Sequence, residues 1–104
     1  MNCTVVGFFT AGRNVAPAEL RNDTQGLTFE PEPLNAFDPN AVKLIMSGVH
    51  VAYVSREDAL AVKAFLALHN NRYTVSVNNT FGASALLELH HLSAAAFEPN
   101  WPID

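Results

Sequence analysis

The sequence predicts a mainly β (α+β) protein in which five or six short strands surround one main α-helix. Two patterns indicate this class: short β-branched or alternating segments separated by frequent turn residues, and one stretch with helical periodicity. Frequent short strands favour a small antiparallel barrel or sandwich over a parallel sheet. With 104 residues, 49% of them apolar and 15% charged, we expect residues 1–104 to form one globular domain.

The first strands are expected at residues 4–10 and 26–30. Residues 4–10 are β-branched and aromatic, which is typical of a buried strand, and alternation would turn one of Phe8 and Phe9 inward. Residues 13–23 are weakly periodic and contain Pro17, so a loop or a poor strand is expected there. Residues 26–30 alternate between apolar and polar, as in a half-exposed strand. Pro31 and Pro33 are expected to stop the pairing, because proline lacks the N–H donor.

A β-hairpin is expected in the middle of the chain. Residues 34–40 are rich in turn formers, and residues 41–46 and 49–54 read as two strands joined by a turn at Ser47–Gly48.

The main helix is expected from Ser55 to about His69. The Ser55 hydroxyl can accept a hydrogen bond from a first-turn amide, and Asn70–Asn71 suit a left-handed turn at the end. The apolar stripe of the helix consists of Ala59, Val62, Phe65 and Leu66.

Two strands and a tail complete the prediction. Residues 73–77 alternate most regularly, residues 78–82 read as a turn, and residues 85–92 are expected to form the last strand. The tail, 93–104, contains Trp101, which would either pack on the domain or serve as an exposed anchor.

Charge and cysteine content limit the function classes. Six basic against ten acidic residues give a net charge of −4, which argues against a non-specific nucleic-acid coat but leaves room for a small local site. Cys3 is the single cysteine, so no internal disulfide is possible, which suits a reducing compartment. Neither a signal peptide nor a membrane span is apparent. We therefore expect a cytoplasmic protein, nuclear if eukaryotic, without a membrane partner.

The central half of the chain resembles the HIRAN domain family. The matching residues are Gly-Leu-Thr-Phe-Glu-Pro at 26–31, Asn-Ala-Phe-Asp-Pro-Asn-Ala-Val-Lys-Leu at 35–44, Val-Ala-Tyr-Val at 51–54 and Arg-Glu-Asp-Ala at 56–59. The family pattern is R-E-P-x-N-P-x-D-x-N-A-I-x-V, then V-G-Y-L, then a helix. Val-Val-Gly at 5–7 also resembles the first strand of the family, so the match covers about residues 5–90.

Three positions depart from the family pattern. Phe29 stands at the usual arginine, Ala36 at the proline and Ala52 at the glycine. Most members of the family are attached to helicase-like ATPases, whereas this sequence has no P-loop motif and no room for such a domain.

The resemblance implies an OB-like barrel that binds the 3′ end of single-stranded DNA, in DNA repair or replication. Aromatic side chains would stack on bases, an aspartate would meet the 3′-hydroxyl and basic residues would hold phosphate. The implied DNA-binding residues are Phe9 (with Phe8 as the alternative), Asn35, Phe37, Asp38, Lys43, Tyr53 and Arg56. Asp38 takes the aspartate position, Phe37 an adjoining aromatic position, and Tyr53 and Arg56 the polar and basic positions.

The same residues also have structural interpretations. An Asp-Pro-Asn sequence at 38–40 is typical of a turn whose aspartate caps local amides. Phe37 could cover a barrel end, and Arg56 at a helix start could be merely solvated. Lys43, like Arg13, would extend a basic rim or have no role.

Other chemistries are less well supported. His90 and His91 are adjacent strand residues that point to opposite faces, which disfavours a shared metal ion with His50 and His69. Cys3 and Ser84 lack a nucleophile context. We therefore expect no enzyme activity, no cofactor and no metal. The alternative function is a protein-interaction module that inhibits or recruits a DNA-processing or defence enzyme, such as a helicase or nuclease, and that would suit a phage-encoded protein.

Overall fold

A computed structural model describes residues 1–9, 13, 15–20, 26–69 and 72–92. The described elements, in chain order, are β1 (Asn2–Val6), the 3₁₀ turn η1 (Pro17–Glu19), β2 (Leu27–Pro31), β3 (Val42–Met46), β4 (Val49–Val54), α1 (Arg56–His69), β5 (Tyr73–Thr80) and β6 (Ala85–His91). The predicted class, mainly β with one main α-helix, is confirmed.

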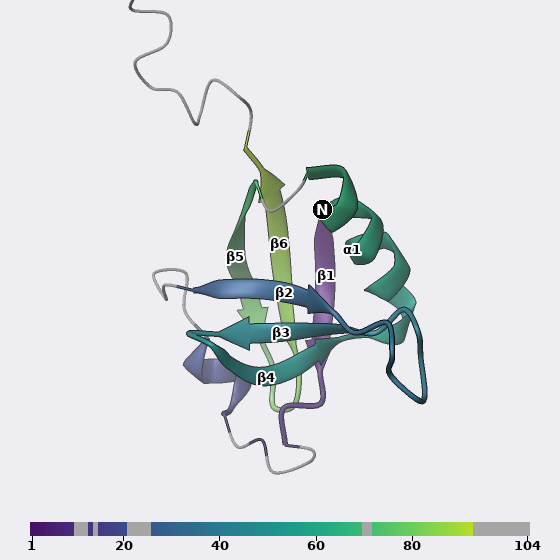
Figure 1. The fold of residues 1–104 in the computed structure, drawn as a ribbon. Helices are drawn as coiled ribbons and strands as arrows, with labels where there is room; N and C mark the ends of the chain where they lie inside the picture. The colour runs from purple at the N-terminus through teal and green to yellow at the C-terminus, as the bar shows by residue number, and fades with distance from the viewer. Residues whose placement is uncertain (10–12, 14, 21–25, 70–71, 93–104) are drawn as a thin grey trace, which may run out of the picture.

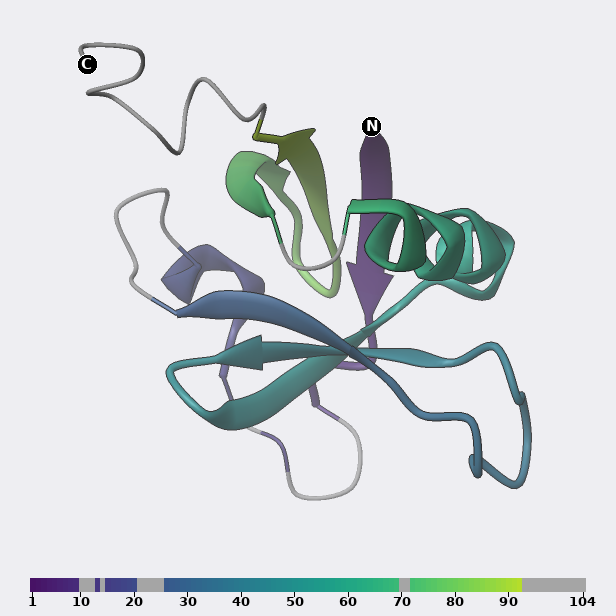
Figure 2. The same ribbon diagram turned by 45° about the horizontal axis from the view of Figure 1, so that its top comes forward.

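The six strands form one sheet in the order β2-β3-β4-β1-β6-β5, and every neighbouring pair is antiparallel. The sheet curls into a half-barrel in which β2, β3 and β4 run across the direction of β1, β6 and β5 (Figure 1). The helix α1 lies beside β1, on the side away from β5 and β6 (Figure 2). This is the small OB-like architecture that the sequence predicts.

The first strand is shifted from its predicted bounds. It runs from Asn2 to Val6 rather than over 4–10, because Gly7 takes a positive φ of 76° that ends the extended backbone. Phe8 then enters the core at 1% exposure, while Phe9 remains 56% exposed. One of the two phenylalanines is inside, as expected, but both lie beyond the strand.

Pro31 does not stop the pairing of β2, which the sequence analysis predicted wrongly. It pairs with Val42 of β3, and the next amide, that of Glu32, donates to the Ala41 carbonyl at 2.8 Å. The physical reason is that β2 is an edge strand. On its outer side there is no neighbouring strand, so the N–H that Pro31 lacks is not needed there. The β3–β4 hairpin is confirmed, with positive φ at both Ser47 (51°) and Gly48 (84°) in its turn.

The helix runs from Arg56 to His69, close to its predicted extent, and three members of the predicted stripe, Ala59, Val62 and Leu66, are buried. The fourth, Phe65, is partly buried against the core. The start of the helix differs in detail: the Ser55 hydroxyl donates to the Asp58 carboxylate at 3.1 Å, and Asp58 Oδ2 accepts from the Thr4 amide at 2.9 Å. Asp58 therefore ties the first turn of α1 to β1.

The remaining predictions are met in part. Residue 17 begins a single 3₁₀ turn in the segment expected to be a loop or a poor strand. The strand β5 extends to Thr80, three residues beyond its predicted end, since Thr80 still pairs with Ala85 of β6. The predicted helix end at Asn70–Asn71 and the tail 93–104 with Trp101 lie outside the described residues.

The core fills the space between the half-barrel and α1. Its fully buried members include Val5, Leu44, Val62, Leu87 and Leu89, each no more than 1% exposed. Within the part of the chain that the structure describes, no helix is long and apolar enough to cross a bilayer.

Candidate functional site

A hollow of about 230 Å³ lies where the β2–β3 loop, the end of β4 and the start of α1 meet. We refer to it as the Asp38 hollow. It is lined by Asn35, Phe37, Asp38, Ala41, Tyr53, Val54 and Arg56. Five of the seven residues that the resemblance implied for DNA binding are in this set: Asn35, Phe37, Asp38, Tyr53 and Arg56. They come from segments that are separate in the sequence and that the fold brings to one place.

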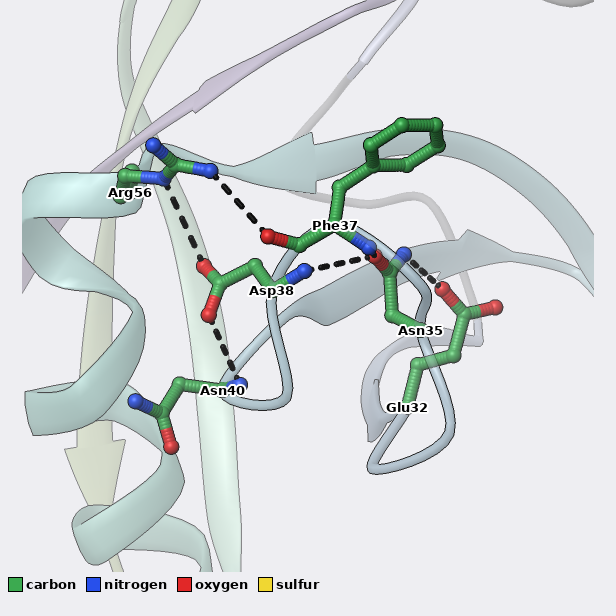
Figure 3. A network of polar contacts seen from close by, with 6 residues as sticks. All are labelled: Glu32, Asn35, Phe37, Asp38, Asn40 and Arg56. Carbon is green, nitrogen blue, oxygen red and sulfur yellow. Dashed lines mark hydrogen bonds and ion pairs between the residues drawn. The ribbon is translucent and has the colours of Figure 1, made fainter.

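Asn35 organises the loop from within. Its side-chain Oδ1 accepts from the amides of Phe37 (2.8 Å) and Asp38 (2.9 Å), and its Nδ2 donates to Glu32 Oε1 at 2.7 Å (Figure 3). An asparagine that accepts from the second and third amides after it forms an Asx turn. The Asn35 amide is therefore part of the framework that sets the backbone of the hollow.

Asp38 caps the turn of the loop and also keeps acceptor capacity for a ligand. Its Oδ1 accepts from the Asn40 amide at 2.9 Å, which is the turn-capping contact that Asp-Pro-Asn sequences favour. Its Oδ2 lies 3.8 Å from Arg56 Nε, and the Asp38 side chain is 21% exposed. An ionised carboxylate has about four acceptor positions, so Asp38 retains capacity for a donor from a ligand.

Arg56 lies at the first position of α1, next to Asp38. Its Nη2 donates a long hydrogen bond of 3.4 Å to the Phe37 carbonyl, and its side chain is 76% exposed. The ion pair between the Arg56 guanidinium and Asp38 is therefore long, and most of the guanidinium N–H donors remain exposed to solvent. Such a fork suits phosphate or another planar anion.

Phe37 projects from the loop, with its ring away from the polar network (Figure 3). The residue is 88% exposed, and Leu34 on the same loop is 94% exposed. The Phe37 backbone is nevertheless held by Asn35, so the exposed ring stands on a fixed support.

Tyr53 offers its hydroxyl to the polar network of the loop, whereas its ring is in contact with Arg13 and His50. The guanidinium carbon of Arg13 lies 5.3 Å from the ring centroid, and His50 packs edge-on with centroids 4.7 Å apart. The hydroxyl donates to Glu32 Oε1 at 2.8 Å. Burial raises the pKa of Tyr53, and the hydrogen bond to Glu32 raises it further, so this hydroxyl keeps its proton at neutral pH.

Glu32 is the residue that the sequence analysis missed. Its Oε1 accepts from both Asn35 and Tyr53, and these hydrogen bonds lower the pKa of the Glu32 carboxyl below its ordinary value. Glu32 was visible in the sequence only as a polar residue between two prolines. Its partner Tyr53 lies 21 positions further along the chain, so no local pattern could reveal the contact.

Two implied site residues are not in the lining of the hollow. Lys43 lies on β3, with Nζ 3.8 Å from both Glu30 Oε2 and Glu32 Oε2 and only 23% of its side chain exposed. Its charge is thus offset by two carboxylates. Phe9 is exposed but is not among the lining residues.

The histidines do not assemble into a metal site in the part of the chain that is described. His69 and His91 stack with centroids 4.6 Å apart, and no group of three or more potential metal-ligating residues is found among the described positions.

Comparisons with known proteins bear on the fold. No protein-family model matches the sequence, and no curated protein matches it. Among solved structures, the HIRAN domain of human HLTF is similar, with a TM-score of 0.55 and 20% sequence identity over 88% of this chain and 73% of that one. The fold of this chain is therefore HIRAN-like.

Proposed function

We propose that the chain binds single-stranded DNA, preferentially at a free 3′ end, through the Asp38 hollow. One observation supports the proposal: five of the seven residues that the HIRAN resemblance implied for DNA contact converge from separate segments on one hollow of about 230 Å³. A single acidic, a single basic and an exposed aromatic side chain then surround a space in which a terminal nucleotide could lie.

Each side chain has a role that follows from its environment. The exposed Phe37 ring offers a face on which a base can stack, worth about 1–3 kcal/mol per base. The open donors of Arg56 would bind a phosphate oxygen. The Asp38 carboxylate would accept from the terminal 3′-hydroxyl, a donor that an internal nucleotide of a DNA strand lacks.

The charges of the hollow also disfavour a terminal phosphate. A 3′-phosphate would bring a second anion against Asp38, whose carboxylate pairs with Arg56 at 3.8 Å. Only one or two phosphates of the strand would meet a basic side chain, so the net charge of −4 is compatible with binding. For the same reason the affinity should fall only gently with salt.

We propose binding to DNA without catalysis. The groups around the hollow act as acceptors, donors and a stacking surface. We therefore place the chain among DNA-binding modules rather than enzymes.

The proposal is tested by titrating the protein into a 5′-labelled oligonucleotide of about ten nucleotides at low salt and recording fluorescence anisotropy. We expect saturable binding that Arg56→Ala weakens, whereas Arg72→Ala, which removes an exposed arginine at the other end of α1, leaves binding unchanged. Absence of binding at low salt would overturn the proposal.

A second candidate function is a protein-interaction module, and the exposed loop favours it. Leu34 and Phe37 together present two apolar side chains, 94% and 88% exposed, on a chain with net negative charge. A helicase or nuclease partner would bury both side chains, whereas stacking on DNA needs only Phe37. Loss of binding to such a partner on Leu34→Ala would favour this function, and an unchanged DNA affinity in the same variant would separate the two.

A further inference from the structure

Three side chains that can carry a positive charge gather around the ring of Tyr53. The guanidinium carbon of Arg13 lies 5.3 Å from the ring centroid, and the His50 ring packs edge-on with centroids 4.7 Å apart. Lys43 of β3 lies directly opposite Tyr53 of β4. Opposed residues of an antiparallel pair place their side chains on the same face of the sheet. We call Arg13, Lys43, His50 and Tyr53 the Tyr53 cluster.

A β-bulge brings His50 into this cluster. The register of β4 with β3 skips Val51, because its two neighbours, His50 and Ala52, pair with consecutive residues of β3. Strand residues three positions apart normally point to opposite faces. The extra residue places His50 on the same face as Tyr53, and their rings are in contact.

The tautomer of neutral His50 follows from one hydrogen bond. Its Nε2 lies 2.9 Å from the Ala52 carbonyl oxygen. Because a carbonyl oxygen only accepts, Nε2 carries the hydrogen and the lone pair is on Nδ1. Acid therefore adds a proton at Nδ1 and leaves the hydrogen bond to Ala52 in place. The added proton brings a positive charge into the Tyr53 cluster.

The surroundings of His50 disfavour this charge at neutral pH. The ring is half-buried, and burial lowers the pKa of His50, as do the nearby charges of Arg13 and Lys43. The Ala52 carbonyl and the Glu32 carboxylate act in the opposite direction, and the net result is a lowered pKa. His50 therefore becomes charged only below its ordinary pKa of 6.5.

Of the two cations beside the ring, Arg13 is held by the weaker contacts. Lys43 forms ion pairs with Glu30 and Glu32, each at 3.8 Å. Arg13 instead contacts two uncharged partners: its Nε donates to the Gly7 carbonyl at 2.8 Å, and its guanidinium lies over the aromatic ring. A cation–π contact at a partly exposed ring is weak, so a like charge placed beside it can outweigh it.

From this geometry we propose that His50 is an acid-sensitive switch: its protonation adds a third positive charge to the Tyr53 cluster and displaces the Arg13 guanidinium from the Tyr53 ring. Tyr53 also lines the Asp38 hollow, so the switch adjoins the candidate site. The displacement requires no ligand. Its failure would therefore leave the DNA-binding proposal unaffected, and the reverse also holds.

Proton NMR of the whole chain from about pH 7.5 to about pH 5 follows protonation and displacement in one sample. Side-chain protons of Arg13 that lie over the ring are shielded, and displacement should move their chemical shifts toward those of an unstructured arginine. This change should have the same midpoint as the titration of the His50 Cε1 proton, below 6.5. Glu32 stays ionised over this range, because its pKa lies below 4.5.

His50→Gln tests the switch directly. Its side-chain amide can still donate to the Ala52 carbonyl but does not titrate, so the Arg13 shifts should stay constant down to about pH 5. His90→Gln is the matched control. His90 is an exposed histidine of β6, and its loss should leave the Arg13 transition unchanged.

Arg13→Gln tests the same coupling from the other side. Removing the guanidinium should raise the titration midpoint of His50 toward 6.5, because one of the charges that oppose protonation is gone. Lys63→Gln is the control for the loss of one positive charge. Lys63 lies on α1, so this variant should leave the midpoint of His50 in place.

Arg13 shifts that stay constant while His50 titrates, or that change equally in His50→Gln, would overturn the proposal. A His50 midpoint that is the same in Arg13→Gln and Lys63→Gln would also overturn it. Circular dichroism checks the fold of each variant. If His50→Gln did not fold, the comparison of Arg13→Gln with Lys63→Gln would still decide the question, because both variants keep His50.

Discussion

The hydroxyl of Tyr53 donates a 2.8 Å hydrogen bond to Oε1 of Glu32, and this contact joins β4 to the loop that forms the Asp38 hollow. The same carboxylate oxygen accepts from Asn35, whose own oxygen holds two loop amides. The loop is therefore anchored to the sheet through one acidic side chain that does not itself line the hollow.

Removing that anchor should loosen the loop. Glu32→Ala leaves the Tyr53 hydroxyl and the Asn35 amide without their acceptor, so we expect a loss of about 1 kcal/mol in the free energy of unfolding. Amide hydrogen exchange at Phe37 and Asp38 should become faster. Glu32→Gln retains a carbonyl acceptor and should show a smaller effect. Glu30→Ala is the control, because the Glu30 side chain is 52% exposed and lies 3.8 Å from Lys43 Nζ, without a contact to the loop among the described residues. Equal effects of Glu30→Ala and Glu32→Ala would contradict the anchoring role of Glu32.

The anchor should also depend on pH. Hydrogen bonds from Asn35 and Tyr53 lower the pKa of folded Glu32 below its ordinary value of 4.5. The resulting stabilisation is fully present above pH 4.5 and is lost as the pH falls through the lower pKa of the folded state. Urea denaturation of the wild type and Glu32→Gln at several pH values should show a stability difference that shrinks at acidic pH. A difference that grows on acidification would have the wrong sign.

Phe37 should matter for binding but not for folding. Its ring is 88% exposed, so Phe37→Ala should leave the melting temperature within about 2 °C, as for other exposed substitutions. Loss of one stacked base, worth about 1–3 kcal/mol, should weaken the affinity for single-stranded DNA by about 5- to 150-fold. Leu34→Ala is the matched control, since Leu34 is equally exposed on the same loop. If the two variants bind equally, Phe37 does not stack.

Cys3 should be unreactive in the folded protein. It is 1% exposed, and burial raises the pKa of its thiol to about 12, so thiolate is scarce at neutral pH. We expect Ellman's reagent to label it slowly at pH 8 and rapidly in denaturant. Fast labelling of the native protein would show that β1 opens readily.

Local patterns were sufficient for the helix and for the β3–β4 hairpin. The Ser47–Gly48 turn and the apolar spacing of α1 both depend on neighbouring residues in the chain. Strand ends were less predictable, because they depend on partners: Pro31 is tolerated only since β2 is at an edge, and Thr80 stays in β5 because Ala85 faces it.

The candidate site was likewise predictable only in part from the sequence. The family resemblance implied seven DNA-binding residues, and the structure brings five of them together in the Asp38 hollow. The sequence could not show that Lys43 forms ion pairs with Glu30 and Glu32, or that Glu32 anchors the loop. Those contacts run between strands and cannot be read from spacing along the chain.

The most direct test compares two 5′-labelled single strands that differ only in a 3′-hydroxyl or a 3′-phosphate, by fluorescence anisotropy at low salt. The wild type should bind the hydroxyl form about tenfold more tightly or better, which is about 1.4 kcal/mol. Asp38→Ala should remove the preference, and Asp38→Asn, which keeps an acceptor for the Asn40 amide, controls for the turn. Equal affinity of the wild type for both strands, or a preference that survives Asp38→Ala, would contradict recognition of a 3′ end by this hollow.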